Sequence, residues 1–286
     1  MQILKTDFIP VALDQAYQRR QKDAEGEFYR KIAGQGPRAT PGFRGTTQGF
    51  YVVDAAGKLL LYNNNRDPEK VHRLLRQKRA EFQKPAQPQL LADGEPDARY
   101  NPAPPQGGLV VRVRAKVLDG YQPTDDRWRK IFQTAVSRDN LWISHKEHQA
   151  LAAGQVPKTL QQRIARFHLV DNTRGEPPMW RESEIRSLEM TLKNGQLQGR
   201  VQLRTDSGDR GYEAELLGEV KTENGKVTAF QLIAKGKFWG EGPYTRRAPA
   251  GKFPLAVSFV LADGSDIADA IPPQGSRGWL PGYIGH

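Results

Sequence analysis

The sequence predicts an α+β fold in two parts: a small α/β unit, then an antiparallel β-sheet or open barrel preceded by helices. Apolar residues alternate from Ile185 onward between Asn-Gly turns, and residues 46–82 carry the pattern of strand, turn, strand and helix. A stretch dense in proline and glycine separates the two patterns. These three observations place the parts at 1–84, 85–108 (a linker) and 109–286.

The front part begins with an apolar run, Phe8 to Leu13, which predicts a strand. Pro10 removes one ladder N–H from it and favours an edge position or a bulge. A polar, charged helix is expected over 16–33, and a loop rich in glycine, proline and arginine over 34–45.

A hairpin and a helix follow. Residues 50–53 and 59–62 are rich in β-formers, and the loop between them ends in Gly57, which can adopt a positive φ. Asp67 is expected to cap a helix whose first position is Pro68, where a missing N–H costs nothing. Helical spacing places one apolar face on Val71, Leu74, Leu75 and Phe82.

These front segments resemble part of a thioredoxin-like domain. The stretch FIPVALD, the helix after it, TTQGFYVVDAAGKLL and DPEKVHRLL are similar to the third strand, third helix, terminal hairpin and last helix of that family. The resemblance covers about the first eighty residues and implies the fold without the redox activity. The family's two redox cysteines would lie upstream of Met1, and Thr46, Thr47 and Gln48 stand where its cis-proline is expected.

The central strands of the family's sheet belong to the half of the domain that the resemblance does not cover. We therefore expect either a native start upstream of Met1 or a strand donated by the rest of the chain. An upstream start would be compatible with export, and the compartment is otherwise left open by the sequence.

The back part begins with an alternating strand over 109–118. Ser144 and Glu147 form a capping box that opens a helix, and Gly154 closes it. The remaining expectations before Ile185 are a short helix starting at Thr124 or Asp125, a helix over 157–166 and a strand over 166–170.

From Ile185 the pattern predicts five or six antiparallel strands. Apolar residues alternate on both sides of the turns at Asn194-Gly195, Ser207-Gly208 and Asn224-Gly225, and a last strong strand covers 253–261. Asn-Gly between alternating runs is the strongest short-range hairpin signal.

The whole chain also resembles a bacterial family with a thioredoxin-like front and a β-rich back. The phrases that carry this resemblance are RFHLVDNTRGEPPMW, GKFWGEGPYTRRAPAGKFPLAV and IPPQGSRGW. It implies no roles for individual residues.

Composition excludes several kinds of chemistry. The chain has no cysteine, so it has no disulfide, thiol nucleophile or thiol redox centre. No apolar run is long enough to span a bilayer. The net charge is +11, and residues 1–84 hold 16 Lys and Arg against 9 Asp and Glu.

That basic excess favours either an anionic partner such as nucleic acid or a solvated surface. The helix after the hairpin carries Arg73, Arg76, Lys78 and Arg79 without interleaved aromatic residues, which nucleic-acid binding would require. We therefore expect a solvated helix face and no nucleic-acid partner.

Three histidines raise the alternative of a metal site. His145 and His148 lie three residues apart on one side of a predicted helix, and His168 with Asp171 could complete an imidazole and carboxylate set. Because the capping box already explains Ser144 to Glu147, the sequence favours a helix start over a metal site here.

The segment 237–252 (KFWGEGPYTRRAPAGK) interrupts the β pattern with aromatic and basic residues. Aromatic faces beside an arginine pair suit a planar or anionic ligand, whereas a long hairpin loop that covers the end of the sheet explains the same residues. The candidate ligand-binding residues are Trp239, Glu241, Tyr244, Arg246 and Arg247.

A charged turn at Asp171, Arg174 and Glu176 is a further candidate. Two carboxylates buried together could perform acid–base work. A surface corner with salt bridges is the more ordinary explanation.

The sequence thus predicts a non-catalytic binding or interaction protein with an aromatic and basic mouth in its β domain. A small anionic or planar ligand or a protein is the expected partner, with no cofactor, and the oligomeric state is left open. The alternative is a metal-assisted or acid–base hydrolase that uses His145, His148 and His168.

Overall fold

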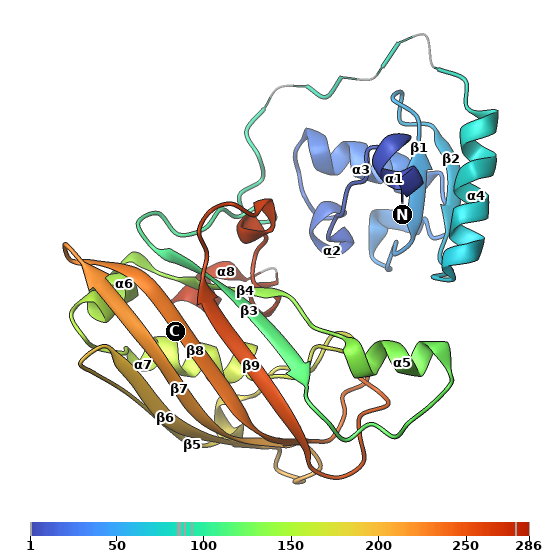
Figure 1. The fold of residues 1–286 in the computed structure, drawn as a ribbon. Helices are drawn as coiled ribbons and strands as arrows, with labels where there is room; N and C mark the ends of the chain where they lie inside the picture. Colours follow the sequence, from blue (N-terminus) through green and yellow to red (C-terminus); the bar gives the residue numbers. More distant parts are fainter. Residues whose placement is uncertain (1, 85–86, 89, 93, 278, 286) are drawn as a thin grey trace. The chain divides into compact units, whose positions relative to one another are not determined.

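A computed structural model describes residues 2–84, 87–88, 90–92, 94–277 and 279–285. The chain divides into two compact units, Met1–Pro102 and Ala103–His286, which we call unit 1 and unit 2 (Figure 1). The division falls within the predicted linker. The fold is α+β, and no helix in the described ranges combines the length and apolar character that crossing a bilayer requires.

Unit 1 holds short helices and one hairpin. Its elements are α1 (Gln2–Thr6), α2 (Gln15–Gln18), α3 (Ala24–Gly34), η1 (Pro41–Phe43), β1 (Phe50–Val53), β2 (Leu59–Asn63) and α4 (Pro68–Glu81).

The hairpin and the last helix of unit 1 are confirmed. Strand β1 pairs antiparallel with β2, and the Asp54 carboxylate closes the turn by accepting the N–H of Ala56 at 2.9 Å. Gly57 adopts φ 78°, which a residue with a side chain rarely tolerates. Asp67 accepts the N–H of Lys70 at 2.8 Å and caps α4, which begins at Pro68.

Two other predictions for unit 1 are wrong. Residues 8–13 form no strand, because a strand needs a partner and no described residue pairs with this segment. The single helix expected over 16–33 is instead two, since Asp23 caps a new helix, α3, by accepting the N–H of Gly26. No donated strand joins β1 and β2 within the described ranges, so they form a two-stranded sheet of their own.

The end of the linker folds back on unit 1. The Asp97 N–H donates to the Asp23 carboxylate at 2.7 Å, and the Tyr100 ring meets the Tyr17 ring edge-on at 6.2 Å. Hydrogen bonds from the backbone N–H groups of Asp97 and Gly26 outweigh partial burial and lower the pKa of Asp23.

Unit 2 is built around one large sheet with helices. Its strands are β3 (Leu109–Val117), β4 (Asp139–Ile143), β5 (Ile185–Lys193), β6 (Gln196–Arg204), β7 (Gly211–Glu223), β8 (Lys226–Trp239) and β9 (Phe253–Leu261). Its helices are α5 (Arg127–Thr134), α6 (His145–Ala152), α7 (Lys158–Arg163), η2 (Ile164–His168), η3 (Glu182–Glu184), η4 (Ile267–Ala270), η5 (Gln274–Ser276) and α8 (Leu280–Ile284).

The strands form an open antiparallel sheet in the order β4-β3-β9-β8-β7-β6-β5, with β4 and β5 at its edges. The first and last strands of this order do not pair with each other. The sheet is therefore open, which is one of the two predicted forms, and not a closed barrel. Asn194 and Asn224 adopt φ 50° and 52° ahead of Gly195 and Gly225, so both predicted Asn-Gly hairpin turns are confirmed.

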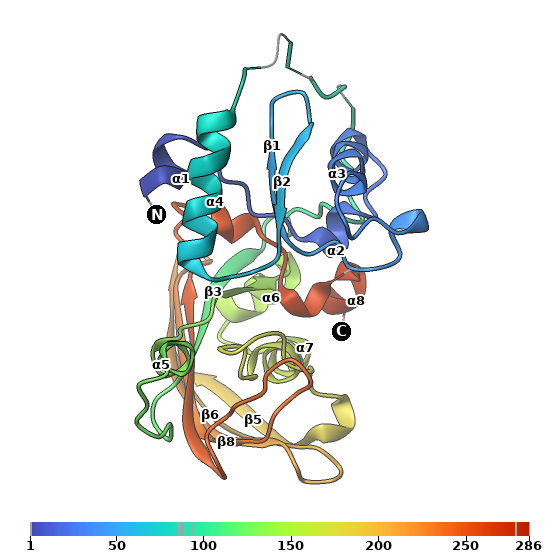
Figure 2. The ribbon, with the colours of Figure 1, turned by 90° about the vertical axis from the view of Figure 1, so that its right-hand side faces the viewer.

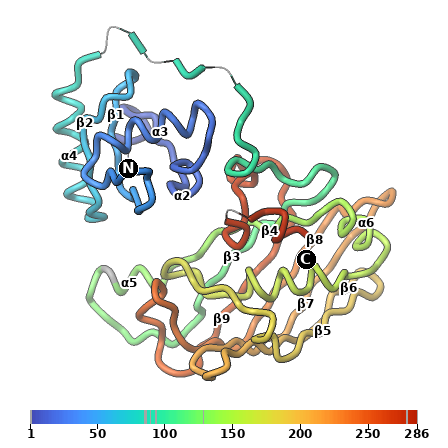
Figure 3. The backbone as a smooth tube through the Cα atoms, turned by 180° about the vertical axis from the view of Figure 1, so that it is seen from behind, coloured from blue at the N-terminus to red at the C-terminus, as the bar shows by residue number. Residues whose placement is uncertain are grey.

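One face of the sheet carries the core. Helices α6 and α7 and the π-helical turn η2 lie on this face, as the edge-on view of Figure 2 and the rear view of Figure 3 show. Alternate residues of each strand point into the core and pack with the buried faces of these helices. The central apolar side chains include Leu203, Leu216, Leu232, Leu255 and Phe259, each at most 2% exposed.

Of the other expectations for unit 2, the helices are confirmed and one strand is wrong. Helices α5, α6 and α7 are confirmed, and α6 has the predicted capping box, with Glu147 N–H donating to Ser144 Oγ at 3.3 Å. The strand expected over 166–170 is wrong. A hydrogen bond from Leu169 N–H to the Ile164 carbonyl continues α7 as a π-helical turn, which buries Phe167 and His168 on the core side.

Candidate functional site

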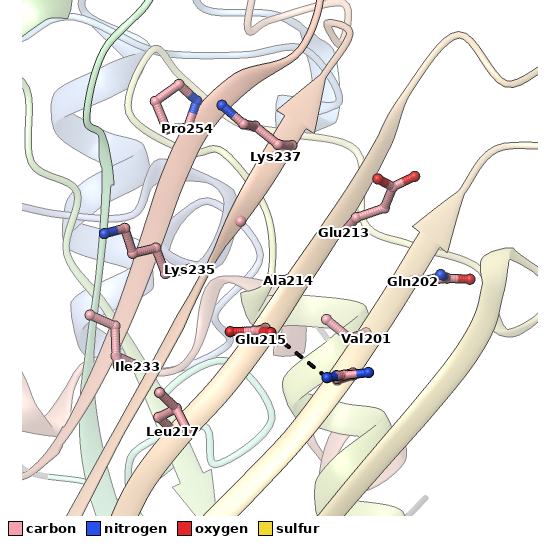
Figure 4. A pocket seen from close by; sticks show the side chains of 12 residues that line it. Val201, Gln202, Glu213, Ala214, Glu215, Leu217, Ile233, Lys235, Lys237 and Pro254 are labelled. Atoms are coloured by element: carbon pink, nitrogen blue, oxygen red, sulfur yellow. Dashed lines mark ion pairs between the residues drawn. The ribbon is translucent and has the colours of Figure 1, made fainter.

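Among the residues that the structure describes, no helix packs on the second face of the large sheet over strands β5 to β9, and we call this the open face. At β3 the short helix η4 contacts the same side of the sheet, where Asp269 accepts a hydrogen bond from Arg112 Nε at 2.9 Å. Side chains alternate along each strand, so the residues on either side of a core residue point to the open face. Figure 4 shows the central part of this face. Its outward residues there are Arg200, Gln202, Glu213, Glu215, Leu217, Ile233, Lys235, Lys237 and Pro254.

An apolar patch lies on the open face where polar residues are expected. Leu217 is 54% exposed, and it stands directly opposite Ile233, which is 42% exposed (Figure 4). Val260, 39% exposed, lies on the next strand, opposite Gln231. Two shallow hollows, of about 630 Å³ and about 410 Å³, meet at Leu217 and Ile233. Exposed apolar side chains that lie next to one another often mark a binding surface.

Opposite charges flank the patch in cross-strand register. Glu213 stands opposite Lys237, and Glu215 stands opposite Lys235. Arg200 reaches Glu215 from the other side at 4.0 Å, the ion pair drawn in Figure 4. Because acidic and basic side chains alternate across the strands, the open face has no field of a single sign.

Of the five residues predicted to bind a ligand, the structure places Trp239 at the end of the open face. Its indole N–H donates to the Gly208 carbonyl at 3.0 Å, and the Lys252 ammonium lies 4.4 Å from the ring centre. The same ammonium pairs with Glu213 at 3.0 Å, which joins Trp239 to the charged rows. Gly211 lies beneath the ring, where a Cβ atom would fall 2.1 Å from it.

The other four predicted residues lie in the loop between β8 and β9. Glu241 accepts the Ala248 N–H at 2.6 Å and so serves the loop itself. Tyr244 is 75% exposed, and Arg246 and Arg247 are also exposed, Arg247 with φ 73°. The contacts of Trp239 and Glu241 go to residues outside the predicted set, so a ligand site made of all five stays a prediction.

The three histidines of the alternative hypothesis are not brought together. His145 Nδ1 and His148 Nδ1 both lie against the Gly107 carbonyl, at 3.1 Å and 3.0 Å, and His148 Nε2 accepts the Val227 N–H. His168 is 2% exposed within the core. Across the part of the chain that the structure describes, no three histidine or carboxylate side chains are arranged to hold a metal ion.

His168 instead belongs to a buried polar chain. Its Nε2 lies 2.6 Å from the Tyr283 hydroxyl, and its Nδ1 lies 3.2 Å from the Asp139 carboxylate. Burial raises the pKa of Tyr283 well above its ordinary value, so the phenol stays protonated where it shares a hydrogen bond with Nε2. A substrate cannot reach side chains that are this buried, so the chain holds β4, η2 and α8 together.

A second buried polar cluster was not predicted. Arg163 and Glu147 form a two-point ion pair, at 2.7 Å and 2.9 Å, although both are less than 5% exposed. The Arg163 guanidinium also donates to the carbonyls of Tyr283 and Ile284, at 2.6 Å and 2.7 Å, and thereby satisfies the end of α8. The sequence reveals Glu147 as a cap but gives no local signal of its long-range partner.

The two carboxylates of the charged turn, Asp171 and Glu176, pair with different arginines. Asp171 pairs with Arg174 at 2.7 Å with both side chains 1% exposed, whereas the exposed Glu176 pairs with Arg277 at 2.8 Å. The two carboxylates therefore do not share a site. Arg174 also donates to the Thr245 carbonyl at 3.1 Å, which anchors the β8–β9 loop.

The basic helix face of unit 1 is solvated. Arg73, Arg76 and Arg79 are exposed, Arg79 pairs with Asp7 at 3.0 Å, and Lys78 pairs with Glu81 at 2.6 Å. Such exposed pairs contribute little stability and define no site.

Comparisons of the chain with models of protein families, with curated proteins and with solved structures find no match. The function is therefore inferred from the geometry of the molecule.

Proposed function

We propose that this chain is a non-catalytic binding protein that holds a protein partner on the open face of unit 2. The observation that carries the proposal is the apolar patch of Leu217, Ile233 and Val260 on the outward side of β7, β8 and β9, where most neighbouring side chains are polar or charged. Apolar centres with polar rims are the usual anatomy of protein interfaces.

The size of the open face supports a protein partner. Neighbouring strands lie about 4.8 Å apart and each residue advances about 3.3 Å, so the strands β5 to β9, of 9 to 14 residues, present roughly 860 Å². A standard protein interface covers about 800 Å² on each partner. The open face is thus large enough, whereas its shallow hollows suit a small molecule poorly.

The charge pattern supports the same class of partner. A nucleic acid needs a surface of one sign, and here Glu213 and Glu215 alternate with Lys235 and Lys237. A folded protein can match such a pattern with its own paired charges, which fixes the register of the complex. Trp239 at the end of the face adds the kind of aromatic anchor that interfaces favour.

For unit 1 we propose a partial thioredoxin-like fold. A hairpin followed directly by the capped helix α4, with α3 before the hairpin, supports this proposal. Because the sequence has no cysteine, the thiol chemistry of such a domain is excluded and a scaffold role is what the fold can provide.

The test is affinity capture with the full chain, followed by calorimetry with the purified captured protein. The double variant Leu217→Lys and Ile233→Lys puts two charges into the patch, and we expect it to weaken binding about tenfold or more. The matched control, Gln155→Lys with Gln162→Lys, adds the same charge at exposed positions on the helical side of the sheet, after α6 and in α7, and is expected to bind as the parent does. Equal affinities for both variants would contradict the proposal.

A further inference from the structure

The outward residues of β7 and β8 form a pattern that is complementary to itself. Three cross-strand pairs follow one another along the two strands: Glu213 with Lys237, Glu215 with Lys235, and Leu217 with Ile233 (Figure 4). In both charged pairs the acid lies on β7 and the base on β8, whereas the third pair is apolar on both strands. The side chains of Glu213 and Glu215 are 48% and 70% exposed, and both lysines are exposed as well.

A two-fold axis parallel to the strands, midway between β7 and β8, superimposes these pairs on one another. It places a second copy face to face with the first, so that β8 of the copy lies over β7 and β7 of the copy lies over β8 at the same level. Glu213 and Glu215 then face Lys237 and Lys235 of the second copy. Leu217 faces Ile233 of the second copy, and symmetry makes each contact twice.

The flanking strands fit the same arrangement. The axis brings β6 over β9 of the second copy, so the register places Arg200 at the level of Ala256 and Gln202 at the level of Pro254. Neither residue of β6 meets a base directly opposite. Sheets packed face to face keep their strand directions within about 30° of each other, so the match is closest near the axis, where the apolar pair lies.

We propose that the open face binds the open face of a second copy of this chain. This inference rests on the proposed function and names its partner. The area agrees: strands β5 to β9 present roughly 860 Å², and a standard interface covers about 800 Å² on each partner.

The net charge of the chain permits this pairing. Of 43 basic and 32 acidic residues, residues 1–84 hold 16 and 9, which leaves 27 basic against 23 acidic for the rest of the chain. The part that contains the open face is therefore close to neutral. At physiological ionic strength its remaining repulsion is screened beyond about 8 Å, whereas the opposed charges of the two faces are in contact.

The experiment is sedimentation velocity with the full chain at physiological salt, from about 1 to about 100 μM protein. Glu213→Lys with Glu215→Lys makes both strands basic, and Lys235→Glu with Lys237→Glu makes both acidic. We expect the parent to dimerise and each variant alone to dissociate at least about tenfold more readily. An equimolar mixture of the two variants should dimerise again, because a basic face then meets an acidic one.

The control Gln155→Lys with Gln162→Lys adds positive charge on the helical side of the sheet and should dimerise as the parent does. Unchanged circular dichroism shows that the variants fold. Three results would overturn the dimer: a parent that is monomeric at about 100 μM, variants that dimerise as the parent does, or a mixture no more dimeric than its components.

The captured protein separates this inference from the proposed function. If the parent is monomeric and Leu217→Lys with Ile233→Lys still weakens the captured protein, the open face binds another protein and only the two-fold dimer is ruled out. If the parent is monomeric and the captured protein binds this variant as well as the control, both are ruled out.

Discussion

Units 1 and 2 differ in how many strands pair in each sheet and in how much apolar core covers it. In unit 2 the neighbouring strands pair, and a large apolar core covers one face of the sheet. In unit 1 the sheet has two strands, and the buried hydrophobic side chains that the structure describes there are Ala16, Tyr17, Tyr29, Ala33 and Leu75. A two-stranded sheet is marginal without further packing. Unit 2 therefore has a sheet and a core of its own, whereas few buried hydrophobic side chains support the short sheet of unit 1.

The chain allows the two units to be followed separately. All five tryptophans lie in unit 2, so tryptophan fluorescence reports the unfolding of that unit alone. Hydrogen exchange of the amides of β1 and β2 reports unit 1.

The largest effect is expected from breaking the buried ion pair of unit 2. Arg163→Met leaves Glu147 charged and buried, and we expect it to lower the free energy of unfolding by about 3–5 kcal/mol. Denaturant unfolding followed by tryptophan fluorescence measures this change. Adding Glu147→Leu removes the unpaired charge and should recover part of the loss. A double variant no more stable than Arg163→Met would show that the ion pair is not the cause.

Acid should weaken unit 2 through Asp269. Hydrogen bonds from Arg112, and then from Arg138, hold the pKa of Asp269 below its usual range against the opposing effect of burial. Because the folded pKa is below the unfolded one, this contribution is complete above about pH 5. It is lost as the pH falls through the folded pKa.

We therefore expect the melting temperature of unit 2 to fall more steeply between about pH 5 and pH 3 in the parent than in Asp269→Asn. The melting curves are recorded by tryptophan fluorescence. Parallel pH dependences in the two proteins would remove Asp269 from the explanation.

The smallest effect on stability is expected in unit 1. The hydroxyls of Tyr29 and Thr47 form a buried hydrogen bond of 2.6 Å that ties α3 to the start of the hairpin. Tyr29→Phe is expected to cost about 1 kcal/mol, seen as faster hydrogen exchange in β1 and β2. Tryptophan-detected unfolding should stay the same. A change in it would mean that the two units do not unfold separately.

Local sequence signals predicted the hairpins of unit 2 and failed where a partner decides the structure. Asn224-Gly225 combines a positive-φ turn with alternation on both sides, so the neighbouring residues alone specify it. The segment 8–13 has equally good strand composition, but no residue in the described ranges pairs with it. The strand expected over 166–170 failed for a related reason: a short apolar run fits a buried helical turn as well as a strand.

The candidate site shows the same division. The ligand-binding role of Trp239 stays a prediction, and the structure places this residue at the end of the open face. The apolar patch was missed, although a signal exists in two apolar doublets, Leu216-Leu217 and Leu232-Ile233. In a strand with one solvated face, a doublet puts an apolar side chain on the wrong side. The register of the β7–β8 hairpin is needed to see that Leu217 and Ile233, the outward members of these doublets, meet.

Hydroxyl-radical footprinting of the complex with the captured partner tests the central claim, which is that unit 2 binds through its open face. We expect oxidation of Leu217 and Ile233 to fall severalfold when the partner is added, while Ile9 and Val11 of unit 1 keep their rates. Unchanged oxidation of Leu217 and Ile233 in a saturated complex would contradict it.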